Sequence, residues 1–175
     1  MKVRLALIGM AISLALGGVA NADDAADPAA PVKQIIAISQ DIFKADAPAK
    51  DDYFSDKWLT VLFSSALAKQ AKEGFAKAQA NDEPFIDYDP VLGGQDGCQP
   101  KDVSITDAGI KDGVSDVVAR FRASYCFDGS DNAFTETHFK VIVENGKAVI
   151  DDIVNTVPDG DPISLRDVMK SYFEQ

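Results

Sequence analysis

Aspartates are the residues of this chain whose types and spacing could do chemistry. They gather in the stretch DYDPVLGGQDGC, residues 87–98, and in a second stretch near the end of the chain: Asp87, Asp89, Asp96, Asp151 and Asp152. Carboxylates held close together raise the pKa of one of them, which can supply both a general acid and a general base. That chemistry, typical of a small hydrolase or isomerase, requires the first and last predicted strands to lie near each other.

A glycine-rich turn is the structural alternative for the same residues. Aspartate and asparagine side chains commonly stabilise turns by bonding to nearby backbone groups. In this interpretation Gln95 and Asp96 hold the glycine turn, and Asp151 or Asp152 ends a strand. The pattern favours the turn over catalysis, and we predict no catalytic residue. The candidate ligand-binding residues from these stretches are Asp87, Asp89, Gln95, Asp96 and Asp152.

The first stretch begins like a calcium loop but does not continue as one. Asp87 and Asp89 take the first and third positions of an EF-hand pattern, but Cys98 stands at the twelfth, where a glutamate would complete the site. A calcium site of another kind, formed by these two aspartates, Asp96 and backbone carbonyls, stays open as an alternative. We predict no metal and no cofactor.

Two arginines and one histidine are the other polar candidates. Arg120 and Arg122 share one face of a predicted strand, where pairing with Glu136 across the sheet is the expected role and anion binding the alternative. His138 is the only histidine, and we expect it on the polar face of the next strand. Both arginines join the candidate ligand-binding residues.

The start of the chain predicts export. A short basic end and an apolar run over residues 5–20 lead into Ala-Asn-Ala, so we expect a signal peptide over 1–22, cleaved near Ala22. The run is too short for a confident membrane span, and we expect no stable membrane insertion after cleavage. A disordered leader over 23–31 and a single α+β domain over 32–175 follow in this prediction.

Charge and cysteine content narrow the class of protein further. The predicted signal peptide carries two basic residues and no acid, so its removal takes the net charge from −11 to about −13. Such acidity argues against nucleic acid and anionic membranes as partners. Cys98 and Cys126 are the only cysteines, and in an exported chain this predicts one disulfide.

The hydrophobic patterns predict helices first and strands after them. Apolar spacing indicates a helix over 32–45 and one long helix over 55–80. Period-two alternation predicts a short strand or strand-like turn over 84–90, and strands over 101–109, 114–127, 133–144 and 147–155. Asn145-Gly146 marks a two-residue hairpin, and Ser164 begins a final helix. We therefore predict an α+β fold, a curved antiparallel sheet packed against N-terminal helices, with a C-terminal helix.

Three short motifs resemble a known family. They are YFSDKWL at 53–59, DYDPVLGGQD at 87–96, and IDDIVN with SLRDVM between 150 and 169. They resemble the bacterial domain-of-unknown-function 3828 family of exported proteins, over roughly residues 33–173. The resemblance implies a nuclear-transport-factor-2-like, cystatin-like cone, in which a curved sheet surrounds helices and often encloses a pocket. It implies no reaction, since this superfold serves enzymes, binding proteins and structural modules alike.

One function and two alternatives follow. We expect an exported, periplasmic or secreted, non-enzymatic binding or accessory protein for an unknown small molecule or protein. Its apolar pocket could be lined by Trp58, Phe63, Phe121 and Tyr125, although core packing explains these aromatic residues equally well. The alternatives are an inhibitor or immunity-type protein that binds an exported hydrolase, and the small carboxylate-dependent hydrolase. A pocket of about 300 Å³ or more favours binding or catalysis, and a protruding acidic loop favours the inhibitor.

Overall fold

Helices come first along the chain, strands follow, and one helix closes it. The computed structural model describes residues 26–45, 51–130, 132–157 and 160–174. Its helices are α1 (Ala29–Ile42), α2 (Asp56–Leu62), α3 (Ser65–Asn81) and α4 (Leu165–Phe173), and its strands are β1 (Lys101–Lys111), β2 (Val114–Arg122), β3 (Thr135–Glu144), β4 (Lys147–Asn155) and β5 (Ile163–Ser164).

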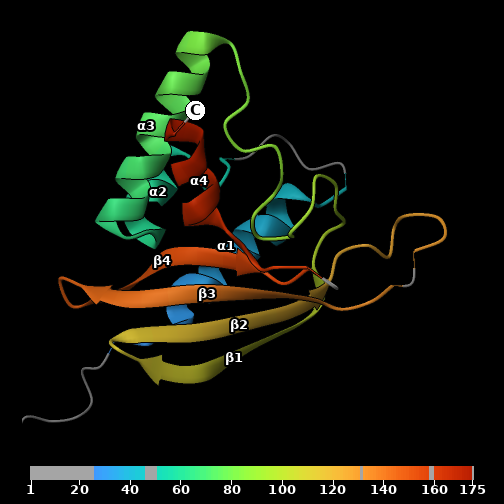
Figure 1. Ribbon diagram of the computed structural model, residues 1–175. Helices are drawn as coiled ribbons and strands as arrows, with labels where there is room; N and C mark the ends of the chain where they lie inside the picture. The colour runs from blue at the N-terminus through green and yellow to red at the C-terminus, as the bar shows by residue number, and fades with distance from the viewer. Residues whose placement is uncertain (1–25, 46–50, 131, 158–159, 175) are drawn as a thin grey trace, which may run out of the picture.

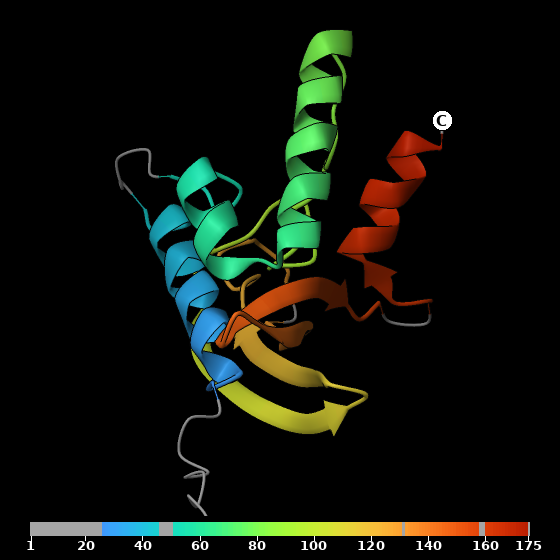
Figure 2. The same cartoon turned by 90° about the vertical axis from the view of Figure 1, so that its left-hand side faces the viewer.

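The strands form a single antiparallel sheet in the order β1-β2-β3-β4-β5. Figure 1 shows the helices gathered on one side of this sheet, and Figure 2 shows the sheet curling toward them. The predicted hairpin turn is confirmed, because Asn145 and Gly146 both have positive φ, 51° and 76°, between β3 and β4. The α+β class and the curved antiparallel sheet are confirmed as well.

The core lies between the concave face of the sheet and α1. Every second residue of β2 is buried, including Val117, Ala119 and Phe121, and Phe139 of β3 and Ile153 of β4 are fully buried beside them. Helix α1 supplies Val32, Ile35 and Ile36 to the same cluster. Burying a side chain of this size stabilises the fold by about 1.5–3 kcal/mol, so these alternating positions fix which face of the sheet turns inward.

The predicted long helix is two helices, which corrects the expectation of one continuous element over 55–80. Phe63 leaves α2 in an extended conformation and forms a parallel bridge with Ile150 of β4. The Ser64 N–H donates to the Ile150 carbonyl at 2.8 Å, while the Ser64 hydroxyl accepts from the Leu67 N–H and begins α3. The buried residues of α2 and α3 continue one helical spacing of apolar positions across the break. The spacing of apolar residues in the sequence therefore gave no sign of two helices.

Helix α1 begins at Ala29, inside the range that the sequence assigned to a leader. Asp27 accepts a hydrogen bond from the Ala29 N–H at 2.9 Å and pairs with Lys33 at 3.1 Å, which stabilises the first turn. The predicted signal peptide lies outside the described residues. Of the helices in the described ranges, none has the length and apolar character needed to cross a membrane.

The segment between α3 and β1 differs most from the prediction. Residues 84–98, which we call the cleft segment, contain no regular strand, so of the two alternatives predicted for 84–90 the strand is wrong. Its one sheet-like contact is an isolated bridge between Asp89 and Gly94. The short strand β5 was not predicted, and β2 ends at Arg122 rather than 127. The cleft segment therefore depends on contacts from other elements for its shape.

Candidate functional site: a cleft beside Asp89

Asp89 organises the turn at the centre of the cleft segment. Its Oδ1 accepts hydrogen bonds from the Val91 and Leu92 N–H groups at 2.8 and 2.9 Å. Its backbone exchanges bonds with Gly93 and Gly94, both at 2.8 Å. Gly93 has a φ of +74°, a conformation that glycine adopts without strain. Asp89 therefore holds this turn, a role that the sequence interpretation gave to Gln95 and Asp96.

Gln95 and Asp96 do not hold the turn in the way the sequence suggested. Both side chains are exposed, and neither bonds to a backbone amide of the turn among the described residues. Gln95 lines the cleft described below, and Asp96 does not. The correction has a simple cause: Asp89, which precedes Pro90, already satisfies the N–H groups that the two later side chains would have bonded.

Two buried polar side chains anchor the turn to the sheet. The Thr137 hydroxyl donates to the Val91 carbonyl at 2.9 Å, and the Asn155 amide donates to the Pro90 carbonyl at 3.0 Å. Thr137 and Asn155 are register partners on β3 and β4, and the Asn155 amide also lies 3.4 Å from the Thr137 hydroxyl. Both are fully or nearly fully buried. Backbone carbonyls that would otherwise be buried without partners are thus satisfied by the sheet.

The predicted disulfide closes the other end of the cleft segment and is confirmed. Cys98 and Cys126 are bonded, with their Cα atoms 6.0 Å apart. The Cys98 N–H also donates to the Ala123 carbonyl at 2.7 Å, just beyond β2. A bridge across a sequence separation of 28 residues stabilises the fold by about 3–4 kcal/mol in the chain-entropy view. A disulfide fits an exported protein.

Tyr53, from the segment that leads into α2, meets Asp89 across the cleft. Its hydroxyl donates to Asp89 Oδ2, and its side chain is almost fully buried. Burial raises the pKa of Asp89 above its usual value, more than the bonds from Tyr53, Leu92 and Val91 lower it. Burial, and then the neighbouring Asp89 charge, also raise the pKa of Tyr53. Tyr53 is therefore a neutral hydrogen-bond donor at neutral pH and not a base.

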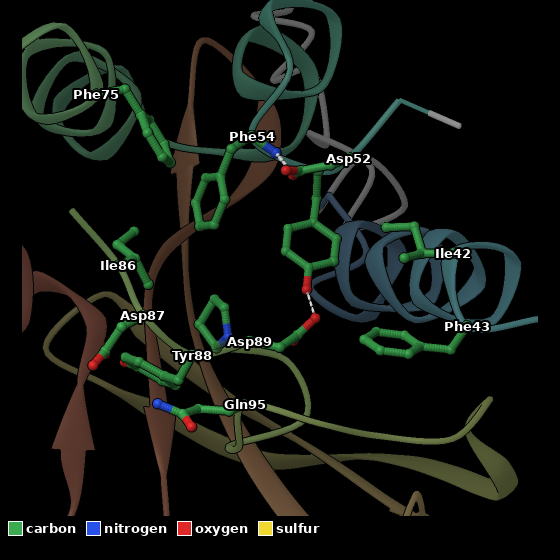
Figure 3. A pocket seen from close by; sticks show the side chains of 12 residues that line it. Ile42, Phe43, Asp52, Phe54, Phe75, Ile86, Asp87, Tyr88, Asp89 and Gln95 are labelled. Atoms are coloured by element: carbon green, nitrogen blue, oxygen red, sulfur yellow. Dashed lines mark hydrogen bonds between the residues drawn. The ribbon is translucent and has the colours of Figure 1, made fainter. Parts of the chain in front are cut away.

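A cleft of about 420 Å³ opens beside this pair. In Figure 3, Ile42 at the end of α1 and Phe43, its C-cap, face Phe54 and Phe75 across the cleft. Ile86, Tyr88 and Gln95 form a further side. Asp52 and Asp87 lie on opposite margins. The lining residues are Ile42, Phe43, Asp52, Tyr53, Phe54, Phe75, Ile86, Asp87, Tyr88, Asp89, Pro90 and Gln95. The cleft is thus an aromatic and aliphatic hollow with acids and one amide among its polar groups.

Asp152 does not join Asp87 and Asp89 in the cleft lining. Its carboxylate accepts from the Ser164 hydroxyl at 2.7 Å and from the Arg166 and Ile153 N–H groups at 3.0 and 2.8 Å. Burial raises the pKa of Asp152 against the lowering effect of these bonds. Its neighbour Asp151 pairs with the Arg166 guanidinium at 2.5 Å. Both aspartates thus join β4 to the start of α4. They lie within β4, which continues to Asn155, so the expectation that one of them ends a strand is wrong.

Arg120 and Arg122 lie away from the cleft lining, and both are paired. Arg120 contacts Glu136 at 3.2 Å, its register partner on β3, so the predicted cross-strand pair is confirmed. Arg122 lies 3.6 Å from Asp102. Both guanidiniums also stack on the Phe134 ring, at 3.5 and 4.4 Å from its centre. This arrangement occupies the cations and gives the anion-binding alternative no support.

The remaining sequence candidates also lie outside the cleft lining. The Tyr125 hydroxyl donates to the Gln99 carbonyl at 3.1 Å, and Lys101 lies over its ring. Phe63 and Phe121 are core residues. His138 contacts Asp116 at 3.1 Å, and Lys140 shares that carboxylate at 3.0 Å. These residues tie strands and loops together.

Sequence reasoning missed most of the cleft. Tyr53 and Phe54 were noted only as the entry to a helix, and Phe43 and Phe75 only as helix-face positions. A usable signal was present in DDYF, residues 51–54, where two adjacent aromatic side chains occupy a break between helices. Aromatic side chains in such a break must pack against another element, and the sequence alone does not show which one.

The comparisons with known proteins add no relative. No protein-family model, curated protein or solved structure matches the chain. The resemblance to the domain-of-unknown-function 3828 family therefore remains a prediction from its short motifs. Within the described ranges, no group of three or more His, Cys, Asp or Glu side chains could hold a metal ion, so the calcium alternative gains no support.

Proposed function

We propose that this is an exported, non-enzymatic protein that binds a small, mainly apolar molecule in the cleft beside Asp89. The observation that carries the proposal is the cleft itself, about 420 Å³ of space with aromatic and aliphatic walls and a few polar groups. Small-molecule sites are usually concave, mostly apolar and supplied with a few placed polar groups. The disulfide supports the exported location.

The chemistry of the lining residues favours binding over catalysis. Serine, cysteine, lysine and histidine, the usual nucleophiles and bases, are missing from the lining. Asp89 is occupied by Tyr53 and by two backbone N–H groups, so it holds the turn in place. Asp152, which the sequence placed with it, is bonded to β5 and α4 instead. The other two carboxylates of the lining, Asp52 and Asp87, lie on opposite margins of the cleft.

The shape of the cleft segment favours binding of a small molecule over the inhibitor alternative. An inhibitory loop would project its central residues toward a partner protein. Here Pro90, Val91 and Leu92 at the tip of the turn are buried against the sheet. Asp87 and Asp89 therefore border a hollow and do not form the tip of a protruding loop.

Two phenylalanines provide a matched test of the cleft. Phe75 lines it and is 38% exposed, whereas Phe173 is 40% exposed and lies outside the lining. Binding of neutral phenylbutanol, followed by NMR shift titration, should weaken about tenfold in Phe75→Ala, the size expected from losing one aromatic contact. Phe173→Ala should bind like the wild type.

Native mass spectrometry of protein purified from the exporting cell then asks whether a small molecule is retained. Loss of that molecule in Phe75→Ala, and its retention in Phe173→Ala, would place it in the cleft. The proposal is overturned if the protein retains no molecule and binds none of the neutral, cationic or anionic phenylbutyl probes, or if both alanine variants behave alike.

A further inference from the structure

The charged side chains that line the cleft are all acidic. Asp52, Asp87 and Asp89 belong to its lining, and none of the twelve lining residues is Lys, Arg or His. Asp52 and Asp87 are exposed, and neither has an ion-pair partner among the described residues. Two carboxylates without an ion-pair partner in the described part of the chain therefore flank an apolar hollow from opposite margins, as Figure 3 shows.

Asp89 contributes charge without being free for direct contact. Its two oxygens already accept from Tyr53, Val91 and Leu92. The effect of the surrounding carboxylates is visible at Tyr88, whose pKa is raised to about 12 by burial first and then by the charges of Asp152, Asp87 and Asp89. A ligand entering the cleft thus meets a negative potential that extends beyond the two margins.

The walls suit a cation as much as they suit an apolar body. Phe43, Tyr53, Phe54, Phe75 and Tyr88 bring five aromatic rings to the lining. The faces of such rings are negative and attract ammonium groups, by about 0.5–2 kcal/mol depending on desolvation. Carboxylates at the margin and aromatic rings in the walls are the two features that recognise an organic cation. The charged group of an anion would be repelled by these carboxylates and ring faces. A neutral molecule would gain binding free energy from contact with the walls alone.

We propose, resting on the proposed function, that the ligand of this cleft is an organic cation, an ammonium group carried on an apolar body. The apolar body packs against Phe54 and Phe75. The ammonium lies between the Asp52 and Asp87 margins, over the ring faces. Asp89 and Tyr53 keep the floor in place and add to the negative potential.

Three probes with one shared body test the class of ligand: phenylbutylamine, phenylbutanol and phenylbutyrate. They share a phenyl ring on a four-carbon chain and end in an ammonium, a hydroxyl or a carboxylate, which is positive, neutral or negative at neutral pH. We expect the amine to bind about tenfold more tightly than the alcohol and the carboxylate to bind most weakly. The advantage of the amine should shrink as salt is raised, because exposed carboxylates are screened.

Asparagine substitutions show which acids carry the preference. Asp52→Asn with Asp87→Asn removes both margin charges while keeping an acceptor for the Phe54 N–H, which Asp52 binds at 2.5 Å. In this variant the amine should bind no better than the alcohol. The matched control is Asp107→Asn with Asp112→Asn, which removes the same charge from exposed positions in and after β1. The control should keep the preference of the wild type.

Each outcome decides between the two proposals. If alcohol and amine bind equally in the wild type, the cleft binds small molecules but the cation proposal is wrong. The cation proposal is also wrong if the amine preference survives the Asp52 and Asp87 substitutions, or if the control loses it equally. If no probe binds to a folded wild-type protein, both proposals fail. A folded state of each variant is checked by circular dichroism and thermal unfolding.

Discussion

The β2–β4 meander and the cleft segment differ in where their hydrogen-bond partners lie in the sequence. Each strand of the meander pairs with the next, and the Asn145-Gly146 turn fixes the register of β3 against β4. The cleft segment takes its partners from distant positions. Thr137 is 46 residues from its partner Val91, Asn155 is 65 from Pro90, and Tyr53 is 36 from Asp89.

This difference separates the contacts that stabilise the fold as a whole from those that shape the candidate binding site. The meander is held by many repeated ladder contacts and by a face of alternating apolar residues, so the loss of one polar contact there matters little. The cleft segment is held by a few individual contacts, and each of them also shapes the candidate binding site. Substitutions in the two regions should therefore differ in kind, and six sets of substitutions can break or sharpen the comparison.

The largest effect is expected in the sheet core. Phe121→Ala should lower the free energy of unfolding by about 3–5 kcal/mol, because a fully buried phenylalanine leaves a cavity when truncated. Urea unfolding, with the slope checked for a change in the denatured state, measures this loss. A loss below about 1 kcal/mol would contradict the placement of Phe121 in the packed core.

The disulfide comes next. Cys98→Ser with Cys126→Ser should lower the free energy of unfolding by about 3–4 kcal/mol, since the unfolded chain regains the freedom of the closed loop. Hydrogen exchange should speed up most at residues 89–98, while the amides of β2, β3 and β4 keep their relative protection. Uniform loss of protection across the sheet would show that the bridge supports the whole fold and not chiefly the cleft segment.

Substitution of the buried polar pair, Thr137 and Asn155, should lower the free energy of unfolding by less. Asn155→Ala and Thr137→Val each leave a carbonyl of the cleft segment without its donor, at about 1–3 kcal/mol. The two losses should not add, because the side chains share one network. Thr156→Val is the matched control, since its hydroxyl donates to the exposed Glu136 carbonyl at 3.2 Å. Additive losses, or an equal loss in the control, would contradict a shared anchor.

The pH dependence of Asp89 sharpens the comparison further. Its folded pKa is raised, so its contribution to stability is full below its usual pKa and is lost as pH rises through the folded value. Because Asp89→Asn does not titrate, its stability relative to the wild type should increase from about pH 4 toward neutral pH. Unfolding by urea across this range measures the change, and a relative decrease would have the wrong sign.

Tyr53→Phe tests the cause of the same titration. The Tyr53 hydroxyl lowers the pKa of Asp89, so its removal should raise that pKa further. The carboxyl carbon shift of Asp89, followed by NMR in both proteins, gives the two midpoints. Asp152, whose pKa burial also raises, serves as the internal control and should titrate unchanged.

The smallest effect is expected at the strand surface. Arg120→Gln removes a half-exposed pair with Glu136, and such pairs contribute about 0–1 kcal/mol. Thermal unfolding should change little, and binding of phenylbutylamine should not change at all. A loss of several kcal/mol would mean that the Arg120, Arg122 and Phe134 stack carries more of the sheet than its exposure suggests.

The elements that could be predicted are those whose signal is local. The alternation along β2, the Asn145-Gly146 turn and the Ser164 cap each name a structure within a few residues, and each was confirmed. The break between α2 and α3 was missed because its cause, the bridge from Phe63 to Ile150, lies outside the helix pattern. Hydrophobic spacing within a window of about 11–18 residues cannot indicate a contact between residues as far apart in the sequence as Phe63 and Ile150.

The candidate site was predictable in part for the same reason. The aspartates and Gln95 of the cleft segment drew attention through their types, and three of them line the cleft. Their partner Tyr53 and the opposite wall, Phe54 and Phe75, come from other elements with no pattern that links them to residues 87–98. Arg120 and Arg122 were named for their charge, and only the paired geometry shows that this charge is used within the sheet.

The disulfide also makes the final structure of the cleft segment depend on oxidation of its cysteine. Cys98 ends the very segment that lines the cleft, and its bond forms only where thiols are oxidised. A chain with reduced cysteines lacks this covalent bond and holds the segment through non-covalent contacts, among them those of Thr137, Asn155 and Tyr53. We therefore expect the reduced protein to bind phenylbutylamine more weakly than the oxidised protein, if the proposed function holds.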